Sequence, residues 1–149
     1  MTQNLLGISS EKYLLKLNKY KVFTVLLGIF ALVINICFLL LRTNENHNIL
    51  LVLSIIVTVA FGWIITATVG IIIKPMAQLY ELSQRPTECV LVTIERINPE
   101  TYRVENFDCQ KIHTEDNIFF LIADGNIRLK EGDTVSLSIA SNIITEVRA

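Results

Sequence analysis

Two uncharged apolar stretches decide the fold of this chain: VFTVLLGIFALVINICFLLL at residues 22–41 and ILLVLSIIVTVAFGWIITATVGIII at residues 49–73. As an α-helix rising 1.5 Å per residue, the first would be about 30 Å long, which matches the hydrocarbon core of a bilayer. The second is longer and can span with some tilt. A cleavable signal peptide is a poor alternative, because the first stretch is too long and no small-residue cleavage site follows it. The sequence therefore predicts two transmembrane helices.

The charges that flank these stretches predict their orientation. Four lysines between residues 12 and 21 precede the first stretch and are opposed only by Glu11, and Lys74 and Arg85 follow the second. The connection at residues 42–48 carries one Arg and one Glu. Because positive flanks stay on the cytoplasmic side, both termini are expected in the cytoplasm of a cell whose inner (cytoplasmic) membrane holds the protein. Residues 9–21 are expected to form a further helix that can lie in the membrane interface.

Small and weakly polar residues recur every fourth position in the second stretch. Residues four apart share a helix face, so this row allows another helix to approach closely. One interpretation is packing against the first stretch, whose only strongly polar side chain is Asn35. The other is self-association into an oligomer or a weakly polar lining for an opening. The row, called the small-residue row below, comprises Ser54, Thr58, Gly62, Thr66 and Gly70.

Composition separates the chain into two halves of opposite charge. Residues 1–74 hold six Lys/Arg against two Asp/Glu, whereas residues 75–149 hold seven against twelve. The acidic second half argues against binding of long nucleic acid through phosphate contacts. No Asp, Glu, Lys, Arg or His interrupts either apolar stretch, so a proton- or ion-coupled transporter is not expected. The three cysteines, Cys37, Cys89 and Cys109, are expected to be free thiols in a reducing compartment.

The second half is expected to be a small all-β domain. Pro75 opens a predicted linker helix within residues 75–86, and six or seven short strand signals separated by turns follow in residues 87–149. Turns are expected at residues 98–100, 115–117, 124–126, 131–133 and 141–142, and residues 127–129 are expected to be a strand. An OB- or SH3-like barrel or a rolled sheet would close so many short edges. The fold class is thus a membrane α-helical hairpin (domain 1–74) followed by a soluble β domain.

No catalytic motif, metal-ligand spacing or phosphate loop is present in the sequence, so neither an enzyme nor a cofactor is expected. Cys109 and His113 could act as nucleophile and base, but nothing recognisable would orient them. Binding of an anionic ligand is more plausible. In an extended segment Lys111 and His113 share one face while Ile112 enters the core. The alternative is that these cations are ordinary solvated side chains. The candidate ligand-binding residues are Lys111, His113, Arg103, Arg128 and Lys130.

This layout, two spans followed by a compact cytosolic β domain in 149 residues, resembles the minimal membrane effectors of bacterial antiphage defence. It is most similar to the CRISPR-associated, cyclic-oligoadenylate-binding membrane proteins of type III systems. A more distant likeness is to the two-span β-barrel effectors of cyclic-oligonucleotide defence. The resemblance implies a homo-oligomer, with a tetramer favoured, whose soluble domains bind a cyclic tetra-adenylate second messenger. Binding would then disrupt the lipid bilayer through the spans.

A second function from a different class is compatible with the same sequence. A membrane-anchored OB-like module could scaffold a membrane complex or serve envelope quality control without any small-molecule ligand. In that case the small-residue row would serve packing only. A thermal shift with cyclic tetra-adenylate discriminates between the two functions.

Overall fold

The computed structural model describes residues 2–41, 43, 46–123 and 125–148. Part of the predicted connection at residues 42–48 and Asp124 of a predicted turn lie outside the described residues. The described chain divides into two compact units. Residues 14–77 form a helical unit, and residues 2–13 together with residues 78–148 form a β unit.

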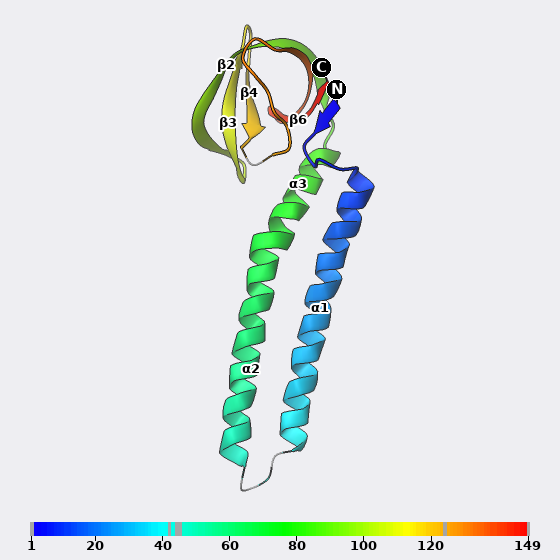
Figure 1. Cartoon of the computed structure of the whole chain (residues 1–149), viewed down its shortest axis with the longest axis vertical. Coiled ribbons are helices and arrows are strands. Elements are labelled where there is room, and N and C mark those ends of the chain that lie inside the picture. The colour runs from blue at the N-terminus through cyan, green and yellow to red at the C-terminus, as the bar shows by residue number, and fades with distance from the viewer. Residues whose placement is uncertain (1, 42, 44–45, 124, 149) are drawn as a thin grey trace. The chain divides into compact units, whose positions relative to one another are not determined.

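The helical unit is an antiparallel pair of long helices (Figure 1). Helix α1 spans Ser10–Leu40 and helix α2 spans His47–Thr68. Both are long and apolar enough to cross a membrane, and most of their large apolar side chains are exposed, Trp63 by 75%. The helix expected separately at residues 9–21 is instead the first part of α1. The reason is that residues 10–27 contain neither Gly nor Pro to break the helix.

A widened turn carries the second helix past Pro75. The π-helical segment η1, Val69–Ile73, joins α2 to α3, Lys74–Gln84, without a break. The amide of Lys74 donates to the carbonyl of Val69, five residues earlier. Proline has no amide hydrogen to donate and its ring crowds the preceding turn, and such widened turns accommodate this disruption. The sequence predicted a new helix beginning at Pro75, whereas the structure continues the existing one.

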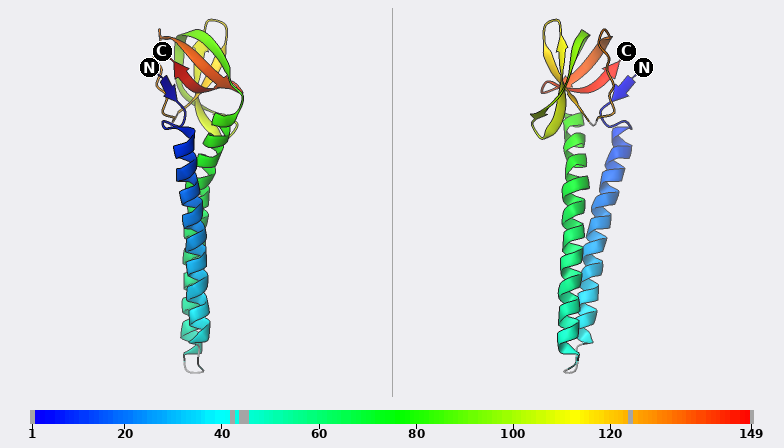
Figure 2. Two further views of the ribbon diagram at one scale, coloured as in Figure 1. Left: turned by 90° about the vertical axis from the view of Figure 1, so that its right-hand side faces the viewer. Right: turned by 60° about the vertical axis from the view of Figure 1, so that its left-hand side comes forward.

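Helices α1 and α2 run side by side (Figure 2), and aromatic, small and polar side chains contact each other between them. The rings of Phe30 and Phe61 lie 6.0 Å apart between centroids. A Cβ placed on Gly28 would lie 3.8 Å from the Cδ1 atom of Ile65, so α1 presents its small residue where α2 presents a large one. Ser54 of α2 donates a hydrogen bond to the side chain of Asn35 of α1.

The β unit contains six strands, five of which pair in a closed ring. Strand β2 pairs with β3 and β5, β3 with β4, β5 with β6, and β4 closes the ring on β6 through the parallel pair Phe120 and Ile143. Strand β1 adds to β6 at the edge (Figure 1). The strands are β1 Thr2–Asn4, β2 Glu88–Val104, β3 Phe107–Thr114, β4 Ile118–Ile122, β5 Thr134–Ala140 and β6 Ile143–Arg148.

Two local predictions for this unit are wrong. The turn expected at residues 98–100 lies inside β2, where the pairing with β3 shifts register between Ile97 and Thr101. Pro99 is tolerated in a strand at such an irregularity, because a bulged residue does not need to donate to the ladder. The strand expected at residues 127–129 is an irregular loop. Its Arg128 amide donates to the Gln3 side chain rather than to a neighbouring strand.

The core of the β unit joins residues from both ends of the sequence. Fully buried isoleucines from β2, β3, β6 and the loop before β5 form its centre. Leu5, 3% exposed, belongs to the same cluster, and its amide donates to the carbonyl of Thr145 over 2.8 Å. The domain boundary expected after residue 74 therefore leaves out a strand and a core side chain that the N-terminal segment contributes.

Candidate functional site

The segment Lys111-Ile112-His113 lies in β3 with its central residue inward. Ile112 is fully buried, whereas Lys111 and His113 are partly exposed. Because side chains alternate across a strand, the two basic residues point to the outer face. The predicted inward and outward directions of these three residues are thus confirmed.

The strands on either side of β3 place further side chains beside these two. Lys111 lies opposite Phe120 of β4, and His113 lies opposite Ile118 of β4 and Arg96 of β2. Directly paired residues share one face of a sheet. Ile118 is 42% exposed and Phe120 is half-buried, so apolar surface borders the cations. This surface, called the β3 face below, comprises Arg96, Lys111, His113, Ile118 and Phe120.

The other predicted ligand-binding residues lie elsewhere or are otherwise engaged. Arg103 is paired in register with Asp108, nearer the β2–β3 turn. The guanidinium of Arg128 donates to the carbonyls of Gly125 and Ile127 over 2.7 and 3.2 Å and so fixes its own loop. Lys130 is an exposed residue at the turn before β5. Of the five residues, the structure brings only Lys111 and His113 together.

Arg96 is the residue of the β3 face that sequence reasoning missed. It lies in β2, and its partner on β3 depends on a register shift between Ile94 and Arg96. Without the shift, a different residue of β2 would lie opposite His113. A bulge of this kind leaves no distinct sequence signal, so the convergence of Arg96 with His113 required the structure.

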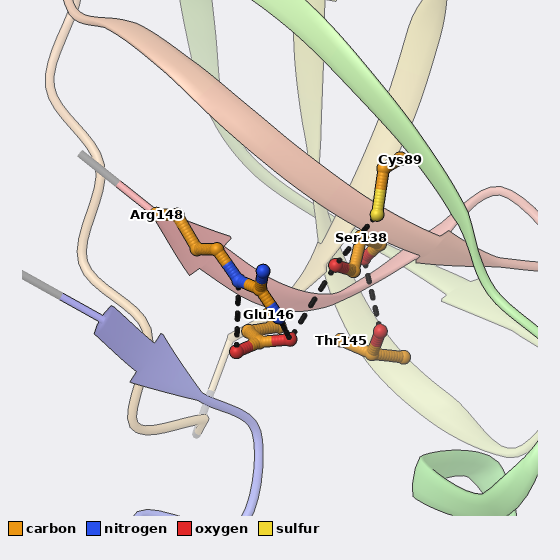
Figure 3. A network of polar contacts seen from close by, with 5 residues as sticks. All are labelled: Cys89, Ser138, Thr145, Glu146 and Arg148. Carbon is orange, nitrogen blue, oxygen red and sulfur yellow. Dashed lines mark hydrogen bonds and ion pairs between the residues drawn. The ribbon is translucent and has the colours of Figure 1, made fainter.

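A second polar cluster lies where β2, β5 and β6 meet (Figure 3). The hydroxyl of Ser138 contacts the Cys89 thiol at 3.5 Å and the Glu146 carboxylate at 3.5 Å. The Thr145 hydroxyl donates to the Ser138 carbonyl over 2.9 Å, and Arg148 donates twice to Glu146 over 3.2 and 3.3 Å. This pairing raises the pKa of Arg148. The cluster joins three strands with most of its polar groups already satisfied.

A cavity of about 300 Å³ adjoins this cluster. Ser138, Thr145 and Glu146 line it from the strands, together with Arg85 and residues of the N-terminal segment. Arg85 forms an ion pair with Glu105 at 2.9 Å, and the hydrogen bond that its guanidinium donates to this carboxylate raises the pKa of Arg85. Both charged residues of the cavity wall thus have an ion-pair partner: Glu146 pairs with Arg148, and Arg85 pairs with Glu105. The cavity is therefore less suited than the β3 face to binding a charged ligand.

The thiol of Cys109 is unsuited to nucleophilic chemistry at neutral pH. Burial, aided by the carboxylates of Asp108 and Glu105, raises the pKa of Cys109 to about 11. The thiolate is the reactive form of cysteine, so at neutral pH very little of it is available. The structure gives no reason to place catalysis at this residue.

The small-residue row of α2 divides into two parts. Ser54 and Thr58 face α1, where both donate to the side-chain oxygen of Asn35, Thr58 over 3.4 Å. A cavity of about 250 Å³ lined by Asn35, Ser54 and apolar residues lies at this contact. Further along, a Cβ placed on Gly62 or Gly70 would meet no described atom within 4 Å. The first part of the row is intramolecular packing, and the second part is open.

Comparisons with known proteins find no relative for this chain: no family model matches it, and neither the curated proteins nor the solved structures yield a match.

Proposed function

We propose that this protein is a membrane effector that binds a cyclic oligoadenylate on the β3 face and disrupts the bilayer through its two helices. The single observation that supports a nucleotide ligand is the convergence of Arg96, Lys111 and His113 beside Phe120. Phosphates favour clustered cations, and bases favour aromatic and imidazole rings on which they stack. Cyclic tetra-adenylate, which the resemblance to type III CRISPR effectors implies, offers both kinds of group.

The strand arrangement supports an OB-like barrel as the binding module. Its ring order, with a long irregular first strand and one parallel closure between β4 and β6, resembles that of the five-stranded OB barrel. In OB barrels the second and third strands form the surface that binds oligonucleotides. The equivalent strands here are β3 and β4, which carry Lys111, His113, Ile118 and Phe120.

The connection of the helices to the β unit supports insertion as a pair. Strand β1 precedes α1 and pairs with β6, while the segment that follows α3 enters β2. Both ends of the helical hairpin thus lead into one folded unit, which must lie on one side of any membrane. This arrangement favours an even number of crossings. Together with the lysine-rich flank, this connection favours a β unit on the cytoplasmic side of the inner (cytoplasmic) membrane.

The open part of the small-residue row supports assembly into a homo-oligomer, and the resemblance to type III CRISPR effectors favours a tetramer. Gly62, Thr66 and Gly70 offer a surface on which a second copy of α2 could pack closely. Symmetry would repeat the three cations of the β3 face in every subunit. Gathered around a symmetry axis, these side chains would form a local anion site in a unit that is acidic overall and has Glu115 and Asp116 in the turn beside the face.

The deciding experiment is a thermal shift of the full chain in detergent with cyclic tetra-adenylate. The full chain is needed because a fragment beginning at residue 75 would lack β1 and Leu5. A ligand at 100 times its dissociation constant should stabilise the β unit by about 2.7 kcal/mol. Linear tetra-adenylate and inorganic phosphate serve as controls and should give smaller shifts. Absence of any shift with cyclic oligoadenylates of every ring size would refute the effector function.

A membrane-anchored OB-like module without a small ligand is the second candidate. Its supporting observation is that Arg103, Arg128 and Lys130 do not join the β3 face, which leaves Arg96, Lys111 and His113 as the basic residues of that face. The β3 face would then contact a protein partner of a scaffold or quality-control complex. Affinity capture of the full chain in detergent, followed by repetition with Phe120→Ala, tests this module: a partner lost specifically with Phe120 would favour it.

A further inference from the structure

A basic and aromatic stripe lies on α1 where its charged part meets its apolar part. Lys16, Lys19, Tyr20 and Phe23 occupy positions i, i+3, i+4 and i+7, which share one helix face. They line a cavity of about 370 Å³. The continuity of α1 through this region is what aligns them, since a break before residue 22 would have separated the lysines from Phe23.

We infer that this stripe is a binding site for the headgroup of an anionic phospholipid. The inference rests on the membrane insertion proposed above. Lys16 and Lys19 are exposed, and neither has an ion-pair partner among the described residues. Cationic side chains next to a membrane span attract anionic headgroups, and each contributes measurably to the affinity.

The two aromatic residues complete the match to a lipid rather than to a free phosphate. Tyr20 lies at the level where aromatic residues favour the headgroup region of a bilayer. Phe23, 54% exposed, is the second residue of the uncharged stretch, where it would contact the upper part of an acyl chain. The charged groups and the apolar group thus occur in the same order along the helix as in a phospholipid.

A lipid titration followed by native mass spectrometry tests this site on the full chain in detergent. Phosphatidylglycerol should bind more tightly than phosphatidylcholine, and Lys16→Gln and Lys19→Gln should each weaken its binding about fivefold. The charge-matched control is the double variant Lys21→Gln/Lys74→Gln, which should change the affinity less than Lys16→Gln/Lys19→Gln because Lys21 projects from the opposite side of α1. Equal losses in the two double variants would overturn the site and leave only a general attraction between charges.

Two further arms separate lipid from phosphate and this site from membrane insertion. Phe23→Ala should weaken the binding of phosphatidylglycerol, whereas inorganic phosphate should bind poorly to the wild-type chain and to every variant. If phosphate bound as tightly as the lipid, the assignment of the site to a lipid would be overturned. Flotation with liposomes is measured in parallel. Failure of the wild-type chain to float would refute insertion itself. Flotation without any preference for phosphatidylglycerol would refute only the site.

Discussion

The Ser54 hydroxyl of α2 donates a hydrogen bond to the side-chain oxygen of Asn35 in α1, and the Asn35 amide nitrogen donates to the carbonyl of Ala31 in its own helix over 2.9 Å. The oxygen and the nitrogen of the Asn35 side chain thus both have a hydrogen-bond partner, and the bond to Ser54 fixes where the two helices meet. A polar contact of this kind between apolar helices sets their register as well as adding stability.

Replacing Asn35 by Leu should loosen the helical hairpin. The change removes the acceptor for Ser54 and Thr58, and interhelical hydrogen bonds in membranes contribute about 0.6–2 kcal/mol. Fluorescence of Trp63, the single tryptophan, can follow unfolding in mixed micelles. The matched control is Thr68→Ala, because the Thr68 hydroxyl donates only within its own helix, to Ile64 over 2.8 Å. Equal effects of the two changes would contradict a special role for Asn35.

Gly62→Leu and Thr66→Leu should each reduce the oligomer. Both add bulk to the open part of the small-residue row, where a Cβ on Gly62 meets no described atom within 4 Å, so the hairpin itself should tolerate them. Light scattering of the detergent-solubilised chain gives the subunit number. Ile64→Leu, at an exposed position on the opposite side of the same helix, is the control and should have little effect. An unchanged oligomer would mean that assembly resides in the β unit.

Cysteine labelling in intact cells should find position 47 outside and position 142 inside. The probes are His47→Cys and Asn142→Cys in a chain whose exposed Cys37 and Cys89 have been replaced by Ala. The buried Cys109 can stay, because its raised pKa keeps it protonated and unreactive at neutral pH. External labelling of position 142 would reverse the proposed orientation.

The same thiol predicts a pH dependence of stability. Burial raises the pKa of Cys109 from the ordinary thiol value of 9.0 to about 11 in the folded chain. Since the unfolded chain loses its proton first, the free energy of unfolding should fall as the pH rises from about 9 to about 11. Urea unfolding across this range, compared with Cys109→Ala, measures the effect. An identical pH profile in the variant would assign the dependence to another group.

Lys111→Ala and His113→Ala should each weaken cyclic oligoadenylate binding about tenfold, which corresponds to about 1.4 kcal/mol for a lost charge-assisted hydrogen bond. Arg96→Ala should do the same, although the sequence alone did not single it out. Folding should survive, because surface substitutions usually change stability by no more than about 0.5 kcal/mol. Titration calorimetry measures the affinity, with Lys12→Ala as a control outside the β3 face. Wild-type affinity in all three variants would move the site elsewhere.

Leu5→Ala should destabilise the β unit by about 2–5 kcal/mol, the usual cost of truncating a buried leucine. Leu5 is 3% exposed within the core cluster, whereas the nearby Ile8 is 41% exposed, which makes Ile8→Ala the control. Thermal unfolding of the full chain reports the difference. Similar small effects of both changes would mean that the N-terminal segment is not part of the core.

Local sequence patterns predicted the features that depend on interactions between residues close in the sequence. Uncharged length identified the two long helices, alternation placed Ile112 inward, and Ser141-Asn142 was recognised as a turn. In the structure Ser141 and Asn142 both have positive φ, 51° and 66°, which suits the tight turn between β5 and β6. Each of these features depends on a few neighbouring residues.

Features set by distant contacts were missed. Strand β1 has three residues and forms because it pairs with the edge of β6. The sequence of residues 2–4 contains no pattern that predicts this pairing. Arg96 faces His113 only after a register shift in β2. Residues 127–129 alternate like a strand, yet the Arg128 amide donates its hydrogen bond to the Gln3 side chain and not to a neighbouring strand. In each case the partner lies far away in the sequence.

The pairing of β1 with β6 also has a consequence for synthesis of the protein. Thr2 pairs with Arg148, so the ribosome makes one strand of this pair before both helices and the other after them. The β1 segment and Leu5 must therefore wait, unpaired, while the hairpin enters the membrane and the remaining strands are translated. The β domain can therefore reach its final stability only after β6 has been translated, and until then its N-terminal segment is open to proteases and chaperones.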